Sequence, residues 1–172
     1  MIYCRTIRIF SFFIALLYLA SCSARNVPRD KSISYILPSG IKRIAKTELD
    51  ENTRAYSAAD DFYFYYGVFL AINFDPRSRF EKMTLERHLD NLKYDLKNTV
   101  EIELLEIRTV RKKRFIVMGY YDQGSQLNVY KFFNDHERHN IVVDGAIQYD
   151  KATQQKEADR LLKIILTSLE MK

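Results

Sequence analysis

The amino-acid sequence predicts an α+β domain, with an antiparallel β-sheet flanked by helices in an α/β/α sandwich. Apolar and polar residues alternate with period two through most of residues 100–149, which is typical of strands with one buried face. Short turn-forming segments interrupt this alternation, so consecutive strands are expected to pair as antiparallel hairpins. Two other segments, 84–98 and 153–172, have apolar residues at helical spacing and can cover the sheet.

The chain before the first of these helices is rich in strand signals. Residues 33–37 predict a first strand, and residues 41–48 a weaker second strand. Residues 48–60 are polar and predict a loop with some helical content. Residues 61–74 are dense in Tyr, Phe, Val and Ile, which favours strand structure, and Gly67 marks a bulge or a break between two strands.

Residues 84–98 predict the first helix. Thr84 is a candidate N-cap, and one apolar stripe follows it, formed by Leu85, Leu89, Leu92 and Leu96. The period returns to two from Val100, and a change of phase at Leu104-Leu105 predicts a β-bulge.

A four-stranded meander and a final helix complete the predicted domain. The basic run Arg111-Lys112-Lys113-Arg114 is the expected turn of the first hairpin, and residues 122–125 form the next turn. The strands are expected at residues 100–107, 115–121, 127–133 and 141–149. From about Thr153 the chain is expected to be helical to its end, with an apolar face made of Ala158, Leu161, Leu162, Ile165 and Leu169.

Residues 1–21 resemble a secretory signal peptide. Arg5 and Arg8 give a positive start, and small residues follow the apolar run 9–19. The segment Leu19-Ala20-Ser21-Cys22 resembles the lipobox of bacterial lipoproteins, in which a diacylglyceryl group alkylates the cysteine thiol before cleavage. This resemblance implies a lipoprotein anchored by acyl chains, such as palmitate, on Cys22.

Two alternatives to the lipoprotein interpretation are an uncleaved transmembrane helix and an ordinary secretory signal with a chance cysteine. The apolar run is shorter than the roughly 20 residues that cross a bilayer. The lipoprotein interpretation predicts a signal peptide at residues 1–21, a lipidated tether at 22–32 and a single α+β domain at 33–172.

Composition limits the possible partners and chemistry. The chain carries 27 basic and 22 acidic residues, a net charge of +5, which is weak support for a polyanionic partner. Predicted export also argues against nucleic acid. Of the two cysteines, Cys4 would leave with the signal peptide and Cys22 would carry lipid. The mature domain would then have no thiol for a disulfide or for thiolate catalysis.

Three segments resemble those of PsbP/Mog1-like domains. They are Tyr35-x-Leu37-Pro38-Ser39-Gly40, Thr84-Leu85-Glu86 and Ala158-x-x-x-Leu162-x-x-Ile165-x-x-Ser168-Leu169. Ile41 stands near the position where such domains usually have a tryptophan, which this chain lacks. The resemblance covers nearly all of the predicted domain. It implies the α/β/α sandwich and a binding, assembly or scaffolding role, with no catalytic residues to carry over.

Two segments are candidates for a binding surface. The aromatic run at residues 62–66 can expose tyrosines, of which we single out Tyr63, Tyr65 and Tyr66, because a tyrosine combines flat apolar area with a polar tip. The alternative is a strand with one face in the core. The basic turn of Arg111, Lys112, Lys113 and Arg114 can contact anionic lipid headgroups, or it can be a solvated hairpin tip whose charges prevent edge association.

The cluster Asp135-His136-Glu137-Arg138-His139 is the sequence's candidate for metal binding. His136 and His139 suit zinc, but only two residues separate them, so the i, i+4 spacing of helical zinc proteases is absent. A solvated loop between strands is the alternative. The sequence has no Gly-x-Ser-x-Gly elbow and no phosphate-binding glycine loop, and we expect no catalytic residues and no cofactor.

These features predict a membrane-anchored envelope lipoprotein that acts as a non-enzymatic binding or assembly module. Its expected partners are the membrane, through Cys22, and an envelope protein or a small ligand. The alternatives are a metal-assisted hydrolase that uses the 135–139 loop and a structural spacer without a ligand. Ser23 replaces the aspartate that follows the cysteine in inner-membrane lipoproteins of some bacteria, so we expect the outer membrane, facing the periplasm.

Overall fold

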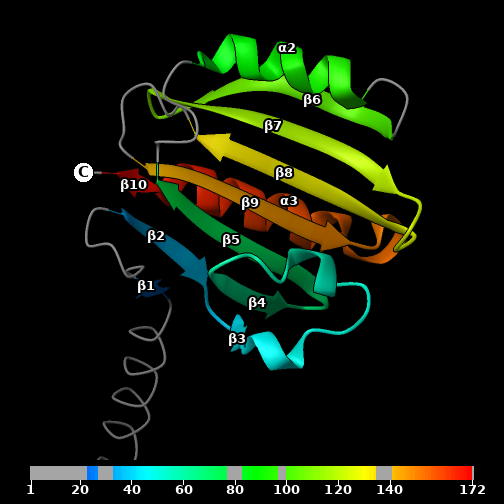
Figure 1. Cartoon of the computed structure of the whole chain (residues 1–172). Coiled ribbons are helices and arrows are strands. Elements are labelled where there is room, and N and C mark those ends of the chain that lie inside the picture. Colours follow the sequence, from blue (N-terminus) through cyan, green and yellow to red (C-terminus); the bar gives the residue numbers. More distant parts are fainter. Residues whose placement is uncertain (1–22, 27–32, 77–82, 97–99, 135–140, 172) are drawn as a thin grey trace, which may run out of the picture.

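The computed structural model describes residues 23–26, 33–76, 83–96, 100–134 and 141–171 (Figure 1). Among these residues, no helix is both long enough and apolar enough to span a membrane. The elements, in chain order, are β1 (Ser23–Asn26), β2 (Ile33–Pro38), β3 (Lys42–Ile44), the 3₁₀ turns η1 (Lys46–Glu48) and η2 (Arg54–Tyr56), β4 (Asp61–Tyr65), β5 (Val68–Pro76), α2 (Leu85–Leu96), β6 (Glu101–Val110), β7 (Lys113–Asp122), β8 (Leu127–Asn134), β9 (Ile141–Tyr149), α3 (Lys151–Ser168) and β10 (Glu170–Met171).

A seven-stranded antiparallel sheet forms the centre of the domain. Its strand order is β3-β4-β5-β9-β8-β7-β6, so the predicted meander of β6 to β9 is confirmed. The chain leaves the sheet after β5, returns at the far edge as β6, and closes against β5 with β9. The break predicted at Gly67 is the two-residue turn between β4 and β5, where Tyr66 and Gly67 both have positive φ angles.

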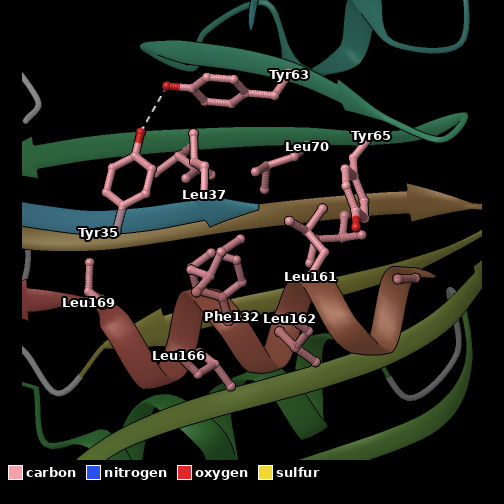
Figure 2. Close-up of a cluster of buried hydrophobic side chains, with 14 of the residues drawn as sticks. Tyr35, Leu37, Tyr63, Tyr65, Leu70, Phe132, Leu161, Leu162, Leu166 and Leu169 are labelled. Atoms are coloured by element: carbon pink, nitrogen blue, oxygen red, sulfur yellow. Dashed lines mark hydrogen bonds between the residues drawn. The ribbon is translucent and has the colours of Figure 1, made fainter. Parts of the chain in front are cut away.

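Helix α3 covers one face of this sheet and packs its apolar side against the strands to form the main core. Asp150 caps its first turn, since the carboxylate accepts hydrogen bonds from the backbone N–H groups of Ala152 and Thr153 at 2.7 and 3.2 Å. Its buried side chains are Ala158, Leu161, Leu162, Ile165 and Leu166. The fifth predicted residue, Leu169, is also buried but follows the helix as its C-cap. Figure 2 labels three of these leucines, with Leu161 above the helix in the view and Leu162 and Leu166 below it.

Strand β2 lies beside α3 on the same face and is separate from the main sheet. It pairs with β1 and with β10, which follows α3 directly. The predicted helix therefore ends at Ser168 and does not reach the C-terminus. Residues Ser23–Asn26, expected to be part of a free tether, pair with β2, so the fold holds this part of the segment.

The opposite face of the sheet is covered by α2 and by the loop that contains η1 and η2. Glu86 of α2 pairs with Arg114 of β7, and the ring of His88 lies 5.2 Å from that of Phe133 on β8. A second apolar cluster lies under the loop and consists of Ile44, Leu49, Phe62, Phe69 and Ala71. With helices on both faces of an antiparallel sheet, the predicted fold class is confirmed.

Candidate functional site

Two of the three tyrosines predicted to form a binding surface are part of the core. Tyr63 is 1% exposed and Tyr65 is 2% exposed, because the face of β4 that carries them is covered by β2 and α3. In Figure 2 the Tyr63 hydroxyl meets that of Tyr35, and the two oxygens lie 3.1 Å apart. The prediction that Tyr63 and Tyr65 are surface residues is therefore wrong. Tyr66, at the turn, is 73% exposed.

The structure divides the basic run at residues 111–114 into two parts. Arg111 and Lys112 are exposed and form the whole β6–β7 turn, in which both residues have positive φ angles of 48° and 66°. Lys113 and Arg114 belong to β7 and are half-buried. Lys113 donates a hydrogen bond to the Leu169 carbonyl at the end of α3, and Arg114 pairs with Glu86. Two of the four predicted cations thus hold the fold together.

The other candidates lie outside the described residues. Cys22 precedes the first of them, and His136 and His139 fall between β8 and β9. Within the described part of the chain, no three His, Cys, Asp or Glu residues come together as a possible metal site.

A groove beside α3 is the candidate site that the structure adds. Because α3 packs on β9, β8 and β5, the last strand β6 extends beyond the helix, and a groove of about 370 Å³ lies between the two. Its lining is more apolar than polar and comes from two strands and α3, namely Leu104, Arg108, Val110, Tyr130, Asp159, Leu162, Lys163, Leu166 and Thr167. Leu162 and Leu166 are themselves core residues, so the groove reaches the main core.

A hydrogen-bonded network forms one side of the groove. The Tyr130 hydroxyl donates to the Asp159 carboxylate at 2.8 Å, and the Gln155 amide donates to both, at 2.7 and 2.8 Å. The Tyr130 ring lies over Gly119 of the neighbouring strand, where an added methyl group would stand 3.1 Å from it. Burial raises the pKa of Tyr130 above its ordinary value, which favours the protonated hydroxyl that donates to Asp159.

Two cationic side chains lie at the rim of the groove, and only one of them is in an ion pair. The Arg108 guanidinium is held by the Glu106 carboxylate at 2.7 and 2.9 Å. Lys163 is exposed, and among the described residues no carboxylate forms an ion pair with its ammonium group. This leaves one positive charge available to an incoming group at the rim.

The chemistry of these groups favours binding. The described residues that line the groove present mainly apolar surface, with polar groups from Tyr130, Asp159 and Lys163. Apolar walls with a few fixed hydrogen-bonding groups and one available cation are typical of recognition sites. Such walls bind an apolar side chain, and the cation attracts a carboxylate.

Sequence reasoning missed the groove because its residues come from three distant segments. Tyr130 alternates in phase with Phe132, which places both on the α3 face of β8. Asp159 and Lys163 are spaced i, i+4 and flank the buried stripe of α3. Each signal was present in the sequence, but only the pairing of β6 with β7 brings Leu104 and Arg108 beside them.

Solved structures of other proteins have a similar fold, although they share little sequence with this chain. No protein-family model and no curated protein matches the chain. The solution structure of cyanobacterial PsbP (CyanoP) from Synechocystis sp. PCC 6803 is similar over 88% of this chain and 94% of that one, with a TM-score of 0.55 and 8% identity. The Ran-binding protein Mog1p of Saccharomyces cerevisiae is similar over 87% and 95%, with a TM-score of 0.55 and 9% identity. The chain therefore has the PsbP/Mog1-like α+β fold that its sequence resemblance predicted.

Proposed function

We propose that this protein is a bacterial envelope lipoprotein that binds a protein partner in the groove between α3 and β6, without an enzymatic reaction. The observation that carries the binding role is the groove itself, with apolar walls, the Tyr130–Asp159–Gln155 network and the available Lys163. The anchoring role is inferred from the lipobox-like segment that ends at Cys22.

Two arguments favour a protein as the occupant. Mog1p, which has a similar fold, is by its name a Ran-binding protein. A domain of this fold can therefore recognise another protein. The groove also has an apolar floor, with the ammonium group of Lys163 at its rim. These features suit a peptide segment that inserts an apolar side chain over Leu162 and Leu166 and places a carboxylate near Lys163.

The proposed anchor predicts the fate of Cys22. Two or three acyl chains bind a bilayer far more firmly than one, at roughly 0.8 kcal/mol per buried methylene. In the native host, intact-mass spectrometry should find residues 1–21 removed and acyl chains on Cys22, and fractionation should find the protein in the outer membrane. Cys22→Ser should release it from the membrane fraction.

A substitution at the neighbouring position is the matched control for Cys22→Ser. Ser21→Ala, also beside the proposed cleavage site, should leave the protein acylated because it keeps a small residue and the thiol. If Cys22 is unmodified in the wild-type protein, the proposed anchor is wrong, whatever the fractionation shows.

The groove predicts a charge-dependent interaction. A photo-crosslinking residue in place of Thr167 should capture a discrete envelope protein, and Lys163→Glu should reduce that capture by about tenfold, the effect of losing roughly 1.4 kcal/mol. Arg160→Glu is the control, because Arg160 is equally exposed on α3 but does not line the groove. Equal losses in both variants, or a captured small molecule in place of a protein, would contradict this assignment.

A further inference from the structure

Strand β6 is incompletely buried although it is ten residues long. It is the last strand of the sheet, and none of its side chains is buried, whereas residues 115–119 of its neighbour β7 all are. Half of the strand is apolar, and each of these side chains is only half-buried: Ile102, Leu104, Leu105, Ile107 and Val110. A long apolar edge of this kind is a site where another strand can pair.

Both faces are open near this edge. On one face Leu104 and Val110 line the groove beside α3. On the other face the apolar stripe of α2 is also only half-buried, at Leu89, Leu92 and Leu96. Helix α2 packs on β6 and β7, and no further strand of the described part of the chain lies beyond β6 on this side.

The geometry of the hairpin determines which backbone groups point outward. Arg111 and Lys112 alone form the turn, so Val110 and Lys113 make the first hydrogen-bonded pair. In an antiparallel ladder such pairs alternate with non-bonded ones. The N–H and C=O groups of Leu105, Ile107 and Thr109 therefore face the open edge.

We propose that a second copy of this chain pairs with that edge, β6 against β6 in antiparallel orientation, with Ile107 opposite Ile107 on the two-fold axis. The β-bulge lies between Ile102 and Leu104, and the turn begins after Val110. The regular part of the strand is therefore 104–110, and Ile107 is its midpoint. This register gives the longest unbroken ladder.

The charges along β6 select the same register. The acidic residues of β6, the last of which is Glu106, all precede Arg108 along the strand, so the strand is complementary to its own antiparallel copy. With Ile107 on the axis, Glu106 lies opposite Arg108 of the second copy, twice. A shift of one residue in either direction places Glu106 opposite Glu106 or Arg108 opposite Arg108, and a shift to Leu105 leaves both charges opposite apolar side chains.

The pairing also changes the groove. Leu104 of each copy lies opposite Val110 of the other, on the face that carries the groove. The two grooves then meet at the axis, between two α3 helices, and the half-buried β6 side chains on both faces gain a neighbouring strand. This inference is independent of lipid attachment and of the partner proposed for the groove.

Charge exchange tests the proposal on the full-length protein in detergent, with sedimentation velocity as the measurement. The wild type should be a dimer. Glu106→Arg and Arg108→Glu should each raise the dissociation constant by about tenfold or more, because like charges then meet twice on the axis. The double variant Glu106→Arg/Arg108→Glu should dimerise as the wild type does, and a mixture of the two single variants should form a mixed dimer. A monomeric wild type, or single variants that dimerise normally, would overturn the proposal.

Crosslinking tests the register and does not depend on the charge variants folding. In a background in which Cys4 and Cys22 are replaced by serine, Ile107→Cys should be crosslinked to itself by a short bismaleimide. Leu105→Cys should not be, since four residues of offset separate the two copies by about 14 Å at about 3.4 Å per residue. Leu105→Cys mixed with Thr109→Cys should be crosslinked, because these positions are opposite each other. Crosslinking of Leu105→Cys alone, or none with Ile107→Cys, would exclude the pairing described.

Discussion

Gly145→Ala is expected to lower the free energy of unfolding by roughly 3 kcal/mol, near the upper end of the usual cost of overpacking. A methyl group at Gly145 would lie 2.1 Å from Cζ and 2.4 Å from Cε1 of Phe132, far inside van der Waals contact. Phe132 is fully buried and faces Gly145 directly across the β8–β9 ladder, so its ring has no free space to enter. Urea denaturation measures the difference.

Two further variants separate this clash from a general cost of losing glycine. At Gly124, in an exposed turn, the added methyl group meets only an Asp122 carboxylate oxygen at 3.4 Å, so Gly124→Ala should change stability little. In Gly145→Ala/Phe132→Leu the smaller side chain should recover part of the loss. If Gly145→Ala were as stable as Gly124→Ala, the conclusion that the Phe132 ring packs directly on Gly145 of β9 would be contradicted.

The glycine positions illustrate what local sequence patterns leave out. Gly119 and Gly145 both lie inside strands, each opposite an aromatic residue of β8 that packs over it, Tyr130 and Phe132 respectively. Neither glycine breaks its strand or forms a turn. Because Gly119 has no side chain, the Tyr130 ring can lie over it beside the groove. This contact depends on the register between β7 and β8, which neither strand's sequence specifies alone.

The fold was predictable where the signal is periodic and local. The leucine stripe of residues 85–96 and the alternation from Val100 predicted α2 and the β6–β9 meander, because burial of one face imposes those periods. The bulge was expected at Leu104-Leu105 and lies between Ile102 and Leu104. Such small shifts arise because hydrogen-bond register depends on the partner strand as well as on the sequence.

The predictions failed where distant segments decide burial. An alternating aromatic strand shows that one face is apolar, but both faces of β4 are covered, one by β2 with α3 and the other by the η1–η2 loop. Tyr63 and Tyr65 therefore belong to the core, although an exposed row was equally compatible with their spacing. The same non-locality hid the groove, which exists only because α3 packs away from β6.

Alkaline pH is expected to destabilise the protein through its buried tyrosines. Burial raises the pKa of Tyr35 and of Tyr149 above the value of about 10 in an unfolded chain, and hydrogen bonds with Tyr63 and Tyr130 add to the effect. Above that pH the unfolded chain releases these protons while the folded state keeps them. The contribution of these two tyrosines to the free energy of unfolding should therefore be constant below pH 10. Above pH 10 it should fall by about 1.4 kcal/mol per pH unit for each tyrosine.

A pair of conservative variants isolates the contribution of one residue. Tyr35→Phe removes one of these protons, so the slope measured by urea denaturation up to about pH 11 should become shallower by about 1.4 kcal/mol per pH unit. Tyr66→Phe is the matched control, because the ring of Tyr66 is 73% exposed in the folded protein. Because the other titrating groups are common to both variants, their effects cancel in this comparison. Equal slopes in Tyr35→Phe and the wild type would mean that Tyr35 reaches solvent, and the packing of β2 against α3 and β4 would then have to be different.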